Sequence, residues 1–184
     1  MTSEDEQKIR ISGMWDCLKR FDGYISAVNV RCGLIASFSV AVFGGVLLKA
    51  DQLMHGGGTV ELLITLFLAA TALAALLSIY FVVKTIWPDL RTNVQGKNKP
   101  SIFFFGSIAD NFTPDTYADA LSGISADEFQ RDLAIQVHEV ATVTKEKFRL
   151  VSRAKTCVNI MVFFLICTVV LVVFNSLGVR LCVA

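Results

Sequence analysis

Three long apolar stretches without a charged side chain constrain this chain more than any other feature. They cover residues 32–48, 62–83 and 156–179. As helices they would reach about 25, 33 and 36 Å, and the hydrocarbon core of a bilayer is about 30 Å thick. The second and third stretches are therefore long enough to cross a membrane. The first is marginal: either Arg31 and Lys49 lengthen it by snorkelling toward the head groups, or it is a buried core helix.

Charge and cysteine content exclude several classes of function. The formal net charge is only +1, which argues against a nucleic-acid polymer as the main partner. The five cysteines form no C-x-x-C pair and have no histidine beside them, so we expect neither a metal site nor a disulfide framework. No nucleophile–base pair, paired acids or phosphate loop stands out, and we expect neither an enzyme nor a bound cofactor.

The distribution of Lys and Arg predicts the orientation in the membrane. Both are frequent before the first stretch and in 84–155, whereas few lie in 49–61 or after 179. By the positive-inside rule, the N-terminus faces the cytoplasm and the C-terminus faces outward. The predicted order is a cytoplasmic N-terminal helix (1–31), a first span (32–48), an external loop (49–61), a second span (62–83), a cytoplasmic insert with a long helix (84–155), a third span (156–179) and an external tail (180–184).

Capping signals and apolar periodicity predict helices on the cytoplasmic side. Ser3 with Glu6 and Ser125 with Glu128 have the spacing of capping boxes, and each should begin a helix that continues into a span. A short helix should begin after Thr113 and end at Gly123. The apolar side of the last helix is expected to comprise Phe129, Leu133, Val137, Val140, Val143, Phe148 and Val151. The fold class is therefore all-α: a three-span helical membrane protein with helices extended into a cytoplasmic bundle.

Two sets of residues suggest contacts of the helices. Small residues recur every fourth position in the first two spans, which lets helix backbones approach closely. They are Gly33, Ser37, Ala41 and Gly45, then Ala70, Ala74 and Ser78. We expect them to pack the first two spans together; the alternative is a seam between protomers. The end of the last cytoplasmic helix is basic and should anchor to anionic lipid. Its cations are Lys145, Lys147, Arg149, Arg153 and Lys155.

One cluster suggests a ligand. Phe103, Phe104 and Phe105 precede Gly106 and Ser107. Aromatic faces stack on nucleobases, and glycine permits close backbone approach. The alternative is that the phenylalanines fill the core of the bundle. Cations that could meet a phosphate are Arg31, Arg91, Lys97, Lys99 and Arg131.

The same residues resemble the Pycsar effector protein family, small membrane effectors of bacterial anti-phage systems. The resemblance covers roughly residues 15–175 and rests on the layout and on the motifs at 103–109, Tyr117, 132–136, Lys147 and Phe148. The family often has an Asp-x-Lys pair where this chain has Asn29-Val30-Arg31, so the cation is kept and the carboxylate becomes an amide.

The resemblance implies a function and a set of partners. A nucleotide cyclase would make a cyclic nucleotide, cUMP or cCMP, and the effector would impair the inner membrane as a homo-oligomer in contact with lipid. The cytoplasmic insert would sense the ligand. The candidate ligand contacts are Phe104, Phe105, Gly106, Ser107, Asn29, Arg31, Arg131 and Gln136. The alternative function is a non-enzymatic membrane scaffold or subunit that binds a protein through this insert.

Overall fold

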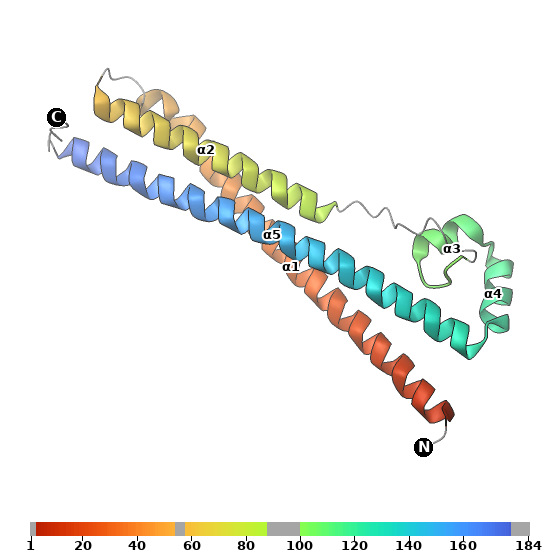
Figure 1. The fold of residues 1–184 in the computed structure, drawn as a ribbon. Coiled ribbons are helices and arrows are strands. Elements are labelled where there is room, and N and C mark those ends of the chain that lie inside the picture. The colour runs from red at the N-terminus through yellow and green to blue at the C-terminus, as the bar shows by residue number, and fades with distance from the viewer. Residues whose placement is uncertain (1–2, 54–57, 88–99, 178–184) are drawn as a thin grey trace. The chain divides into compact units, whose positions relative to one another are not determined.

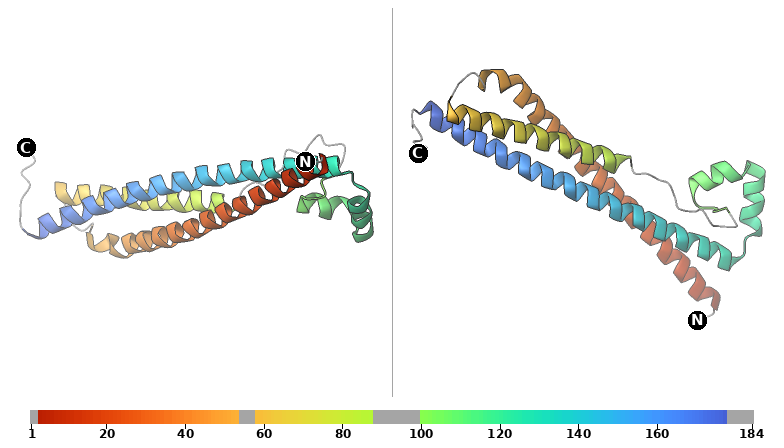
Figure 2. Two further views of the ribbon diagram at one scale, coloured as in Figure 1. Left: turned by 90° about the horizontal axis from the view of Figure 1, so that it is seen from below. Right: turned by 45° about the horizontal axis from the view of Figure 1, so that its top comes forward.

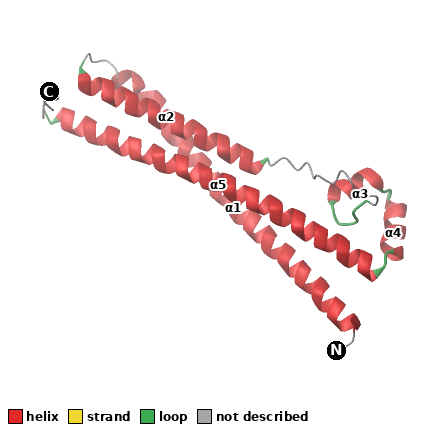
Figure 3. Cartoon of the chain, in the orientation of Figure 1, coloured by secondary structure: helices red, strands yellow, loops and turns green. Residues whose placement is uncertain are grey.

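The computed structural model describes residues 3–53, 58–87 and 100–177, and in these ranges it contains helices and no strand (Figures 1 and 3). The helices are α1 (Ser3–Leu53), α2 (Thr59–Ile86), α3 (Phe105–Asn111), α4 (Pro114–Gly123) and α5 (Ala126–Ser176). Three of them, α1, α2 and α5, are long and apolar enough to cross a membrane. The predicted all-α, three-span class is confirmed. The predicted cations Arg91, Lys97 and Lys99 lie outside the described residues.

Both long helices begin where the sequence predicts. The first turn of α1 contains Glu4, Asp5 and Glu6, whose negative charges favour a helix N-terminus. At the start of α5, Ser125 Oγ accepts a hydrogen bond from the backbone N–H of Glu128 at 3.2 Å. Each helix has 51 residues without a proline, so nothing in either sequence interrupts the backbone hydrogen bonds.

The ends of the shorter helices follow from local chemistry. The backbone N–H of Gly58 donates to Glu61 Oε2 at 2.6 Å before α2 begins. Thr113 caps α4 by accepting from the backbone N–H of Thr116 at 3.3 Å, and the helix ends at Gly123 as predicted. The seven-residue helix α3 was not predicted, because its N-cap residue is Phe104, which has no side-chain oxygen to signal a helix start.

The chain divides into two compact units. Unit 1 comprises Met1–Ala27 and Asp89–Glu146, and unit 2 comprises Val28–Pro88 and Lys147–Ala184. The helices α1 and α5 each supply residues to both units. Unit 1 contains α3, α4 and the aromatic segment, whereas unit 2 contains the three apolar stretches.

The core of unit 2 is built from α1, α2 and α5, and α2 lies beside the C-terminal part of α5 in Figures 1 and 2. One cluster joins Val28 and Cys32 of α1 to Val82 of α2 and to Val151 and Ala154 of α5. Farther along, Phe67 of α2 and Phe164 of α5 have ring centroids 5.7 Å apart. Ser39 Oγ donates to Ser78 Oγ at 3.1 Å in a buried contact between α1 and α2.

The small residues of the first span do not pack against the second span, and that prediction is wrong. Gly33, Ser37, Ala41 and Gly45 are all exposed in the single chain. The helix buries Val28, Cys32, Ser39 and Val46 instead, because these positions, four or seven residues apart, form the side of α1 that meets its neighbours. In the second span, by contrast, Ala74 and Ser78 are buried as expected.

The packed side of α5 also differs from the prediction at one point. Phe148 is exposed, and Lys147 is 6% exposed. The buried positions 133, 144, 147, 150, 151 and 154 follow three- and four-residue spacing. Phe148 also fits this spacing, four residues after Thr144, yet its ring is 38% exposed. Lys147 therefore does not belong to the predicted lipid-facing basic cluster.

Candidate functional site

The aromatic segment 101–104 in unit 1 is held by a hydrogen-bonded network. Asp132 Oδ2 accepts from Ser101 Oγ and from the backbone N–H of Ile102, both at 2.9 Å. Ser101 Oγ in turn accepts from the backbone N–H groups of Phe103 at 3.2 Å and Phe104 at 3.3 Å. Because the carboxylate fixes one backbone N–H directly and two more through Ser101, the segment has a defined conformation on α5.

A tyrosine from α4 fixes the same segment from another direction. The hydroxyl of Tyr117 donates to the backbone oxygen of Ile102 at 3.0 Å. Ile102 is buried, so this hydrogen bond satisfies a carbonyl that water reaches poorly. Tyr117 and Asp132, two residues of the predicted motif, thus position the segment within unit 1.

The three phenylalanines have different environments. The ring of Phe103 makes edge contacts with Trp15 of α1, at 5.8 Å between centroids, and with Phe129 of α5, at 5.0 Å. Phe103 therefore fills the core of unit 1, as the alternative interpretation states. The rings of Phe104 and Phe105 lie 5.0 Å apart, and Phe105 is 69% exposed, so its face is open to a planar ligand.

Gly106 and Ser107 complete this cluster. A Cβ atom at position 106 would lie 2.7 Å from Cε1 of Phe104, so glycine lets that ring pack against the start of α3. The hydroxyl of Ser107 is buried, and it has no hydrogen-bond partner among the described residues. Buried polar groups nearly always have partners, so an unpaired hydroxyl marks a place where a ligand or water could bind.

The other candidate contacts do not join this cluster. Arg131 is exposed and Gln136 is half-buried on α5 in unit 1, and no hydrogen bond between the described residues links either one to 104–107. Asn29 and Arg31 are exposed on the part of α1 that belongs to unit 2. The structure therefore groups Phe104, Phe105, Gly106 and Ser107.

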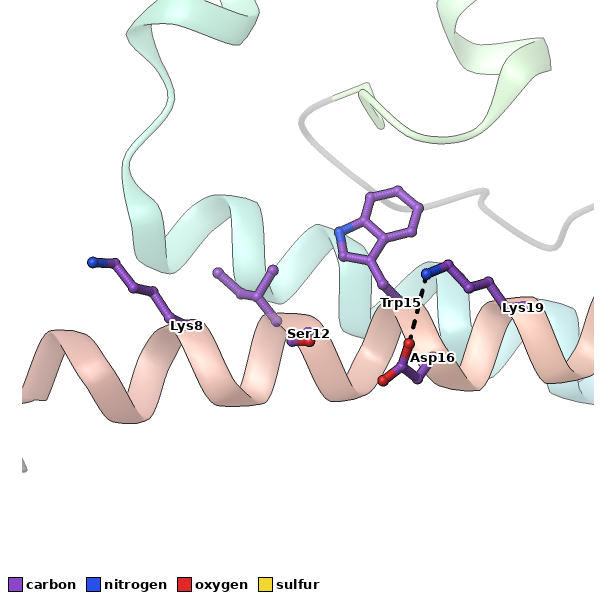
Figure 4. Close-up of a pocket in the computed structure, with 6 residues that line it drawn as sticks. Lys8, Ser12, Trp15, Asp16 and Lys19 are labelled. Carbon is purple, nitrogen blue, oxygen red and sulfur yellow. Dashed lines mark ion pairs between the residues drawn. The ribbon is translucent and has the colours of Figure 1, made fainter.

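Sequence reasoning missed an open surface patch on one side of α1 in unit 1. The patch is shallow and open to solvent, and Figure 4 shows its side chains, all of which belong to α1. They are Lys8, Ile11, Ser12, Trp15, Asp16 and Lys19. Lys19 Nζ lies 3.7 Å from Asp16 Oδ1. The spacing of two lysines around a tryptophan was visible in the sequence, but only the apolar stripe was considered.

A second missed feature is the contact of Lys147 in unit 2. Its Nζ donates to the backbone oxygen of Thr85 at 2.8 Å. Thr85 is in the last turn of α2, where carbonyls have no partner within the helix and the helix dipole attracts cations. Burial lowers the pKa of the Lys147 ammonium. Nearby, the guanidinium of Arg153 lies 6.0 Å from the ring centroid of Phe81.

The described residues contain no group of three or more His, Cys, Asp or Glu side chains that could hold a metal ion. The described residues also offer groups that can bind a ligand, namely aromatic faces and an unpaired hydroxyl, and helices long enough to cross a membrane.

Comparison with known proteins agrees with this arrangement. The family model of the Pycsar effector protein domain matches residues 13–174. No curated protein and no solved structure shows significant similarity to the chain. The matched domain is not a known enzyme family. The chain belongs to the Pycsar effector protein family, membrane proteins that act with a cyclic-nucleotide signal in anti-phage defence.

Proposed function

We propose that this protein is an effector of the bacterial inner membrane that a cyclic pyrimidine mononucleotide, cUMP or cCMP, triggers during infection. A nucleotide cyclase makes the ligand, and the effector then impairs membrane integrity and arrests growth. The observation that supports this proposal most directly is the division of α1 and α5 between two units. Each helix supplies residues to unit 1, which contains the aromatic segment, and to the apolar unit 2.

The physical basis of the response is differential affinity. A ligand shifts a conformational equilibrium only by as much as it prefers one state over the other. The helices α1 and α5 run without a break from unit 1 into unit 2. We propose that this continuity passes a ligand-induced displacement of either helix in unit 1 to its continuation in unit 2. Altered packing of the spans would then open a path through the membrane.

The ligand contacts remain those predicted from the sequence. The exposed ring of Phe105 and the unpaired hydroxyl of Ser107 support stacking and hydrogen bonding of a base at 104–107. The other proposed contacts are Asn29, Arg31, Arg131 and Gln136.

The proposed orientation places the N-terminus and 84–155 in the cytoplasm, where the cyclase product is made. We also propose a homo-oligomer. It is supported by the exposed small residues Gly33, Ser37, Ala41 and Gly45, since such residues allow close helix approach in lipid. A single three-helix chain encloses little space, so a leak between several copies fits the function better than a pore within one.

The proposal is tested by measuring membrane potential in cells that express the protein with a uridylate or cytidylate cyclase. Depolarisation should follow only when the cyclase is active, and a cyclase without its catalytic residues is the matched control. Unchanged potential at saturating cyclic nucleotide would reject the effector mechanism. If the protein instead formed a stable complex with another protein and bound no nucleotide, the scaffold function would be favoured.

A further inference from the structure

We infer that the hydrogen bond from Lys147 to the Thr85 carbonyl is a latch that keeps the spans of unit 2 together, and that activation requires Lys147 to leave it. For what releases the latch, a cyclic nucleotide, the inference rests on the proposed function. The latch itself lies wholly within unit 2, because Thr85 and Lys147 both belong to that unit.

The latch lies where α5 enters unit 2. Lys147 is the first residue of α5 in that unit, and Thr85 is in the last turn of α2. Along α5, a displacement that begins in unit 1 therefore reaches Lys147 before it reaches any other residue of unit 2. This position suits a contact that decides whether the displacement continues into the spans.

Among the described residues, the latch is the only hydrogen bond that joins α2 to α5. The hydroxyls of Thr71 and Thr168 donate to carbonyls of their own helices, so they do not connect the two. Other contacts between these helices are apolar, as between the rings of Phe67 and Phe164. In lipid, helices gain little from the hydrophobic effect and are held together by packing and interhelical hydrogen bonds. Release of Lys147 therefore leaves α5 held to α2 by packing.

The buried ammonium of Lys147 has no counter-charge among the described residues, and this makes the latch releasable. Lys147 is 6% exposed, and no ion pair in this part of the chain includes it. Burial of an unpaired charge costs free energy, and the same cost lowers the pKa of this ammonium. Hydration regained on release offsets part of the lost hydrogen bond, and the flexible stem of lysine lets the ammonium reach water. A modest preference of the ligand for the released state is therefore enough to open the latch.

Amine labelling of the full chain in proteoliposomes measures release of the latch without a mutation. An N-hydroxysuccinimide ester is added at one pH, and mass spectrometry follows the labelling of each lysine. Lys84 on α2 and Lys145 on α5 are exposed and serve as internal references. Without ligand, Lys147 should be labelled more slowly than both references, because it is buried. Addition of cUMP or cCMP should raise its labelling rate relative to them, and uridine should not.

Lys147→Met removes the latch, and vesicles that contain this variant should release a trapped dye without nucleotide. Loss of the buried hydrogen bond should shift the equilibrium between closed and open arrangements toward the open one by about 5- to 150-fold. Basal release should therefore rise above that of the wild type, and less nucleotide should be needed for full release. Lys84→Met is the matched control, because Lys84 is an exposed lysine next to Thr85 and should leave both quantities unchanged.

The outcomes separate the latch from the proposed function. If nucleotide makes the wild type leak while Lys147 stays protected from labelling, and Lys147→Met vesicles behave like the wild type, the inference is overturned and the proposed function stands. If Lys147→Met leaks while the wild type stays sealed at saturating nucleotide, the latch stands and the proposed trigger fails. If circular dichroism shows that Lys147→Met has lost its helices, the labelling of the wild type decides alone: a Lys147 that stays protected while the vesicles leak overturns the inference.

Discussion

Replacing Lys147 by methionine tests whether a buried ammonium ties α5 to the end of α2. Methionine has a similar length, so the packing of the side-chain stem is kept while the hydrogen bond to the Thr85 carbonyl is lost. That bond is 2.8 Å long, and Lys147 is only 6% exposed, so water does not readily replace it. An unpaired buried carbonyl costs about 1–3 kcal/mol.

The expected loss is therefore about 1–3 kcal/mol in the free energy of unfolding. At about 2–4 °C per kcal/mol for a chain of this size, the midpoint of thermal unfolding should fall by about 2–12 °C. Circular dichroism of the protein in detergent measures the shift. Lys145→Met is the matched control, because Lys145 is exposed on the same helix and should change the midpoint little. A Lys147→Met protein as stable as the wild type would refute the reasoning, since relief from burying a charge would then outweigh the lost bond.

Three further predictions concern the fold around the candidate site and the spans. Asp132→Ala removes the acceptor of two hydrogen bonds and should lower the local stability of 101–104 by about 1–3 kcal/mol. Hydrogen exchange at 101–104 should therefore be faster in the variant, and unchanged exchange would contradict the anchoring role. Gly106→Ala should lower the free energy of unfolding, because the new Cβ displaces the ring of Phe104. Gly13→Ala has open space around it and should stabilise α1 by about 0.5–1 kcal/mol. Equal shifts of the thermal midpoint in the two variants would refute this contrast. A double-mutant cycle on Ser39→Ala and Ser78→Ala should give a coupling of about 0.6 kcal/mol, and strict additivity would show that their hydrogen bond contributes nothing.

The helices were predictable because their signals are local. The caps at Thr113 and Ser125 and the uncharged stretches depend on neighbouring residues and on bilayer thickness, so α2, α4 and α5 begin or end near the predicted residues. The short helix α3 was missed because its first residues are apolar and its N-cap is Phe104.

Contacts between helices were less predictable, since they depend on which side of each helix meets a partner. The four-residue spacing of Gly33 and Gly45 suggested packing against the second span, but the structure leaves both exposed. Lys147 was assigned to a lipid-facing cluster because of its charge, and the structure buries it against Thr85. Ser101, which fixes two amides of the aromatic segment, has no sequence signal of its own.

Dye release from proteoliposomes tests most directly whether cyclic-nucleotide binding by this protein compromises a membrane. The purified full chain is reconstituted into vesicles that contain a self-quenched dye, and cUMP or cCMP is added on the side that the N-terminus faces. The account predicts release at nucleotide concentrations that match the measured dissociation constant, and no release with uridine. Vesicles that stay sealed while the protein is saturated with nucleotide would contradict it.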